Sequence, residues 1–180
     1  SLREAITAIN AGNSLGDPDI VAQAPGTFGT NDTINFNIAG AGVKTINVGS
    51  SALPTISKPV TINGYSQPGA SVNTLANADN AVLLIQLNGT SAGSGANGLT
   101  LGSGSSTSTI KGLVINRFSG NGIVIQSNSN TIVGNFIEQE APFVQKNATL
   151  VTIFAGLNEI NTITAALGAG AGGSDPNGYV

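Results

Sequence analysis

The sequence contains no cysteine and no histidine, and only 8% of its 180 residues are charged. Without cysteine the chain has no disulfides, no thiolate metal ligands and no cysteine nucleophile. Without histidine it lacks the most common general base and metal ligand. Its six lysines and arginines are scattered, so we expect no nucleic-acid partner. No run approaches the roughly 18 apolar residues of a membrane-spanning helix, so we also expect no membrane span.

What the sequence does contain is glycine, with 25 residues, together with frequent asparagine, serine and threonine. The hydrophobic content of 40% and the net charge of only −3 argue against a disordered chain. Stacked strands suit this composition, because β-branched side chains fill an interior while glycine and asparagine accept the positive φ of tight corners.

A short phrase recurs in the middle of the chain. Residues 109–115 (TIKGLVI) and 131–137 (TIVGNFI) share Thr, Ile, Gly and a final Ile at an offset of 22 residues. Residues 98–101 (GLTL) and 122–125 (GIVI) are related by 24 residues. Two offsets of this length predict an all-β solenoid, a parallel β-helix whose coils stack on one another. An antiparallel sandwich is the alternative, but its hairpins do not require similar segments to recur at a nearly constant offset along the chain.

The pattern also predicts the elements of this solenoid. Residues 1–11 form a capping helix that covers an open end, with Ser1 and Glu4 as a capping box. Residues 65–80 form a protruding loop. Phe36 and Phe136 are expected in the core, which leaves Tyr65 as the ligand-binding candidate for a polysaccharide. Strands are predicted at residues 33–38, 44–48, 59–63, 82–87, 98–101, 110–115, 123–125 and 132–137.

Three segments resemble a known family. Residues 1–6 (SLREAI) are similar to the N-terminal signature of the CSLREA family of secreted bacterial proteins, without its leading Cys. Residues 56–69 (ISKPVTINGYSQPG) match the phrase that follows in such proteins, and residues 130–137 (NTIVGNFI) are similar to their coil consensus. The resemblance covers residues 1–137. It implies a right-handed parallel β-helix of the pectate-lyase-like type, secreted or at the cell surface.

After Ile137 the repeat is lost, and residues 138–180 have a different character. Residues 148–154 predict a buried strand, residues 158–167 a helix, and residues 168–178 a Gly-rich loop, which is an α/β pattern. Residues 150–160 (LVTIFAGLNEI) are similar to the third conserved block of SGNH hydrolases. By this resemblance Gly156 and Asn158 are the oxyanion donors, and Glu159 replaces the usual Asp.

The rest of a hydrolase site is missing from the sequence. An oxyanion hole acts on a charge that a nucleophile and its base create, and neither the Gly-Asp-Ser nor the Asp-x-x-His motif of that family occurs. Residues 138–180 therefore indicate either a foreign or truncated α/β segment, as in a chimera, or a C-terminal cap of the solenoid.

The carboxylates indicate neither a metal site nor a cofactor. Asp79 is isolated, and Asp17 and Asp19 flank a proline in a pattern typical of a turn. An ice-binding face would need regular ranks of threonine, and the repeat supplies only Thr109 and Thr131.

The sequence favours a non-catalytic scaffold or adhesion segment, whose partner would be a polysaccharide or another cell-surface component. It leaves open whether the chain is an enzyme. An incomplete SGNH-type esterase and a polysaccharide-binding module are the alternatives.

Overall fold

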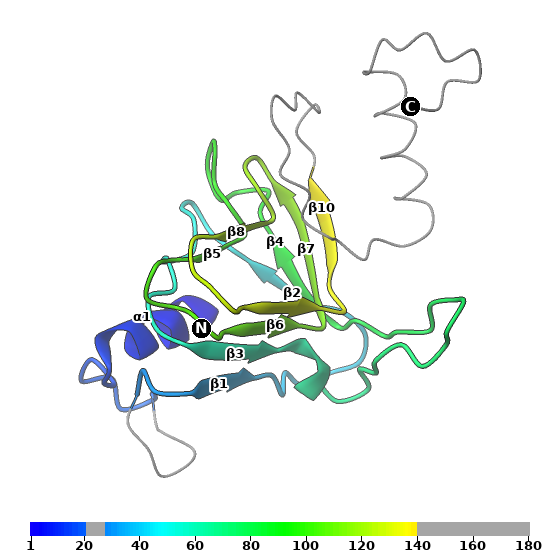
Figure 1. Cartoon of the computed structure of the whole chain (residues 1–180), viewed down its shortest axis with the longest axis horizontal. Helices are drawn as coiled ribbons and strands as arrows, with labels where there is room; N and C mark the ends of the chain where they lie inside the picture. The colour runs from blue at the N-terminus through cyan, green and yellow to red at the C-terminus, as the bar shows by residue number, and fades with distance from the viewer. Residues whose placement is uncertain (21–27, 140–180) are drawn as a thin grey trace, which may run out of the picture. The chain divides into compact units, whose positions relative to one another are not determined.

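The computed structural model describes residues 1–20 and 28–139. These residues form one α-helix, one short 3-10 helix and ten strands (Figure 1). The helices are α1 (Leu2–Ala11) and η1 (Gly64–Ser66). The strands are β1 (Asp32–Asn35), β2 (Lys44–Asn47), β3 (Val60–Asn63), β4 (Ile85–Asn88), β5 (Leu99–Leu101), β6 (Thr109–Lys111), β7 (Leu113–Phe118), β8 (Ile123–Ile125), β9 (Thr131–Val133) and β10 (Phe136–Gln139).

The strands belong to three parallel sheets, which the chain visits in a repeating order. One sheet has the order β1-β3-β6-β9, the second β10-β7-β4-β2, and the third pairs β5 with β8. Every pairing between these strands is parallel. The predicted all-β, parallel and solenoid-like arrangement is confirmed at this level.

Isoleucine and leucine side chains stack in register inside the sheets. Ile34, Ile62, Ile110 and Ile132 occupy one rank across four strands. Ile46, Leu87, Ile115 and Ile137 form the corresponding rank of the second sheet. Ile62, Leu87, Ile110 and Ile115 have no exposed surface. Alternation along each short strand turns the intervening polar residues outward, which is the period-two pattern of a half-buried strand.

Helix α1 packs on this core as the sequence predicts. Its capping box is formed, because the Ser1 hydroxyl accepts from the Glu4 amide and the Glu4 carboxylate binds the Ser1 backbone nitrogen. Leu2, Ile6 and Ile9 join the same buried cluster as the strand residues. The helix ends at Gly12, whose φ of 73° is the left-handed conformation typical of a helix C-terminus.

The repeated phrase spans a corner, not a single strand. The predicted strand at 110–115 is divided into β6 and β7 at Gly112, and the one at 132–137 into β9 and β10 at Gly134. Both glycines have positive φ, 72° and 60°, which strongly disfavours continuing a strand. The glycine conserved between the two repeats is therefore the bend that directs the chain from one sheet to the next.

Asparagine side chains connect successive strands at these bends. Asn135 Oδ1 accepts from the Leu113 amide at 3.0 Å, and Asn135 Nδ2 donates to the Ile110 carbonyl at 2.9 Å. Asn130 Oδ1 accepts from the Ser108 amide, also at 3.0 Å. Backbone groups that leave the ladder at a corner thereby keep hydrogen-bond partners.

Two sequence predictions about apolar residues are wrong. Phe36 is buried as expected, but Phe136 is 43% exposed. Phe136 pairs with Val114, which lies between the inward-facing Leu113 and Ile115, so the strand alternation turns it outward. The predicted strand at 82–87 begins only at Ile85, and Val82 instead makes an antiparallel bridge to Ser71. This bridge closes a protruding loop (Figure 1).

Candidate binding groove

A hollow of about 370 Å³ lies beside the sheet β1-β3-β6-β9 and the protruding loop. We call it the Tyr65 groove. Tyr65, the ligand-binding residue predicted from the sequence, lies in the wall of this hollow. The lining residues are Asn63, Tyr65, Val72, Asn73, Lys111, Val133 and Gly134.

The Tyr65 side chain lies against Gly112 and Gly134, the two glycines at the bends between strands. It follows β3 in η1, and its hydroxyl donates to the Gly134 carbonyl at 2.9 Å. A Cβ atom at Gly112 would lie 2.7 Å from Cδ2 of the ring, and one at Gly134 would overlap the hydroxyl. Burial raises the pKa of the Tyr65 hydroxyl above its ordinary value, and the Asp79 carboxylate adds to the effect. The hydroxyl therefore remains a donor throughout the neutral pH range.

Asn63 and Lys111 are register partners on the outward face of β3 and β6. Asn63 Nδ2 donates to Asn35 Oδ1 at 3.3 Å, but Asn63 Oδ1 is buried without a hydrogen-bond partner. Lys111 is half-buried, and its ammonium makes no hydrogen bond or ion pair with the described residues. Within the described part of the chain, the groove thus presents one cation without an anionic partner, whereas the unpaired Asn63 Oδ1 is closed off from solvent.

The opposite wall comes from a loop held by its own side chains. Asn73 Nδ2 donates to the Leu75 and Ala78 carbonyls at 3.2 and 2.9 Å, and Asn73 Oδ1 accepts from the Asn80 amide at 3.2 Å. Asn80 Oδ1 in turn accepts from the Thr74 amide at 2.8 Å. This network gives the loop a defined shape. Val72, which precedes Asn73, lines the groove together with Tyr65 and is 53% exposed.

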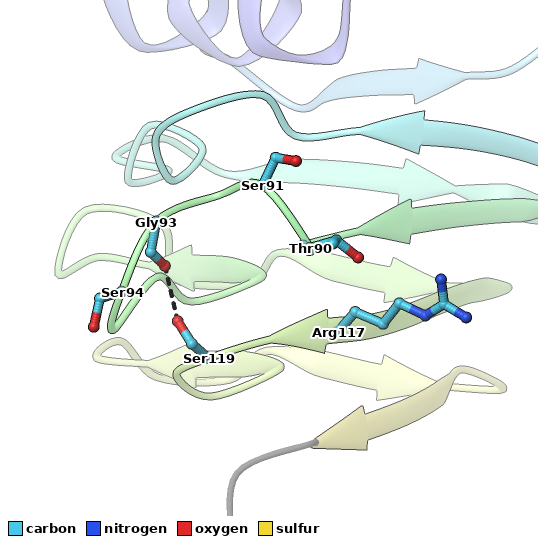
Figure 2. Close-up of a pocket in the computed structure, with 7 residues that line it drawn as sticks. Thr90, Ser91, Gly93, Ser94, Arg117 and Ser119 are labelled. Carbon is cyan, nitrogen blue, oxygen red and sulfur yellow. Dashed lines mark hydrogen bonds between the residues drawn. The ribbon is translucent and has the colours of Figure 1, made fainter.

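A second hollow, of about 430 Å³, is formed where the loop after β4 approaches the end of β7 (Figure 2). Its polar residues include Thr90, Ser91, Ser94, Arg117 and Ser119, and Ser119 Oγ donates to the Gly93 carbonyl at 2.8 Å. Figure 2 shows the Arg117 guanidinium directed away from the serine hydroxyls. These groups do not converge on one point, so this hollow is the weaker candidate for a ligand site.

The outward face of β1-β3-β6-β9 carries more threonine than the repeat indicates. Thr33, Thr61, Thr109 and Thr131 are register partners and form one rank, of which sequence analysis found only the last two. The adjacent rank is mixed, with Asn35, Asn63, Lys111 and Val133. A cation and an isopropyl group interrupt the polar pattern, so the face is not a regular hydroxyl array.

The described residues offer little for metal or acid–base chemistry. Within 1–20 and 28–139 no three Asp or Glu side chains gather where they could hold a metal ion. Asp17 and Asp19 form a local turn, in which Asp17 Oδ1 accepts from the Asp19 amide at 2.9 Å. The oxyanion donors expected from resemblance, Gly156 and Asn158, lie outside the described residues, as do the predicted strand 148–154, helix 158–167 and loop 168–178.

Tyr65 was predictable from the sequence as a candidate, but its neighbours Asn63 and Lys111 were not. These two residues are 48 positions apart, an offset that matches neither repeat length because the protruding loop is inserted between them. No helix in the described ranges is long and apolar enough to cross a bilayer. Comparisons with models of protein families, with curated proteins and with solved structures gave no match to this chain.

Proposed function

We propose that residues 1–137 are coils of a right-handed parallel β-helix that serves as a non-catalytic scaffold or adhesion segment of a secreted or surface bacterial protein. This proposal is supported by the order of the strands, because successive strands of the chain join three parallel sheets in turn. The isoleucine and leucine side chains of these strands stack in register. Such a stack displays side chains at fixed spacing and requires no reactive centre. The chain also has no histidine or cysteine to activate a nucleophile.

Turnover assays test the non-catalytic role. Purified chain should hydrolyse neither p-nitrophenyl acetate nor a polyuronate above the buffer rate, and Asn158→Ala should behave identically. Reproducible turnover by the unaltered chain would contradict the proposal. If Asn158→Ala then abolished ester hydrolysis, the hydrolase interpretation of residues 138–180 would take its place.

We propose saccharide binding in the Tyr65 groove as a second candidate function. It is favoured by the combination of an aromatic ring, an exposed Val72 and the asparagines Asn63 and Asn73 around one hollow. An aromatic ring offers an apolar surface with a polar edge, and amide groups satisfy hydroxyls that are removed from water. A polysaccharide at the cell surface is the partner that these groups fit best.

A further inference from the structure

We propose that the Tyr65 groove selects a saccharide that carries an acidic group, and that Lys111 is the residue that recognises the acid. This inference rests on saccharide binding, the second candidate function above. It adds the charge of the ligand and the residue that determines it.

Lys111 has no charged neighbour in the sheet. Its Cα partners across the sheet are Asn63 on one side and Val133 on the other, neither of which carries a charge. Lys111 is half-buried as a residue, lines the groove and has no anionic partner among the described residues. A cation that is partly removed from water is stabilised by a carboxylate or sulfate, through a charge-assisted hydrogen bond.

The apolar part of the groove then favours an organic acid over a simple anion. Asn63 Oδ1 is closed off from solvent, so it is not a ligand contact in this conformation. An acidic substituent of a sugar ring can accept from Lys111. The Tyr65 ring and the Val72 side chain supply the apolar surface that a sugar ring covers and that an inorganic anion would leave exposed.

Asp79 carries a negative charge that disfavours the binding of an acidic sugar. It lies near enough to Tyr65 to raise the pKa of that hydroxyl, and its Oδ1 accepts from the Ala81 amide at 2.8 Å. Its carboxylate would repel an acidic sugar weakly across water. Removing this charge should therefore strengthen binding, whereas removing the Lys111 charge should weaken it, and the two effects have opposite signs.

A matched pair of ligands tests the proposal. Cello-oligosaccharides of one chain length and the same oligosaccharides oxidised to carboxylates at C6 differ mainly in charge. Binding of both to the whole chain is measured by calorimetry, for the unaltered protein, Lys111→Gln, Asp79→Asn and the control Lys58→Gln. Lys58 is an exposed cation that does not line the groove, so its variant makes the same change in net charge.

We expect the carboxylated ligand to bind about tenfold more tightly than the neutral one, which is the effect of one charge-assisted hydrogen bond. Lys111→Gln should remove this preference, Asp79→Asn should increase affinity about twofold, and Lys58→Gln should change nothing. Equal binding of both ligands with no effect of Lys111→Gln would overturn the inference and leave saccharide binding intact. Equal losses in Lys111→Gln and Lys58→Gln would also overturn it, and no binding of either ligand would overturn both proposals.

Discussion

Replacing Gly64 by alanine is expected to lower the free energy of unfolding by about 3 kcal/mol or more, at the upper end of overpacking effects. Gly64 follows β3, and its added Cβ would overlap the carbonyl oxygen of Gly112 and lie 2.6 Å from the carbonyl carbon. Both atoms belong to the backbone of the next corner, so no side-chain rotation relieves the clash. The two strands would have to separate, and their ladder would be lost.

Chemical denaturation measures this effect, and Gly49→Ala is the matched control. Gly49 has a φ of 68°, but a Cβ atom there would meet nothing within 4 Å. Its substitution should cost only the roughly 1 kcal/mol of a left-handed non-glycine residue. If Gly64→Ala were no more destabilising than Gly49→Ala, the close approach of successive corners would be wrong.

The second large effect is expected from the isoleucine rank of the first sheet. Ile110 is fully buried between its register partners Ile62 and Ile132. Ile110→Ala should lower the free energy of unfolding by about 2–5 kcal/mol, because it removes buried apolar surface and leaves a cavity that a rigid stack fills poorly.

Ile38→Ala is the control for this substitution, since Ile38 is the same residue type but 41% exposed. It should cost about 1 kcal/mol or less. Both variants are compared by urea unfolding with a common slope, so that a change in midpoint reports stability. Similar losses in the two variants would show that residue 110 does not lie inside the stack.

The sequence predicted those parts of the fold that depend on local repetition. The 22-residue offset pairs Thr109 with Thr131, and the 24-residue offset pairs Leu99 with Ile123, as the structure has them. The capping helix was also predictable, because its signal lies within four residues, Ser1 to Glu4. In each case the information is contained in a short segment or in two similar ones.

The register of the other strand pairs depends on loops of unequal length, and no motif in the sequence marks those lengths. β3 pairs with β6 across 48 residues, whereas β1 pairs with β3 across only 28. The groove exists because of the longer connection, so the approach of Lys111 to Asn63 could not be predicted. The outward position of Phe136 was missed for a related reason, since the bend at Gly134 resets which face each following residue occupies.

The chain has no cysteine, so engineered thiols test the stacking of its strands most directly. Thr61 and Thr109 are register partners on adjacent strands, which are ~4.8 Å apart in a sheet, while Thr61 and Thr131 are separated by two such spacings. A disulfide requires Cα atoms within about 7 Å. Mild oxidation should therefore join Thr61→Cys to Thr109→Cys within one molecule and leave the Thr61→Cys/Thr131→Cys variant unlinked. Failure of the first pair to form, or equal formation of both, would contradict the stacked arrangement.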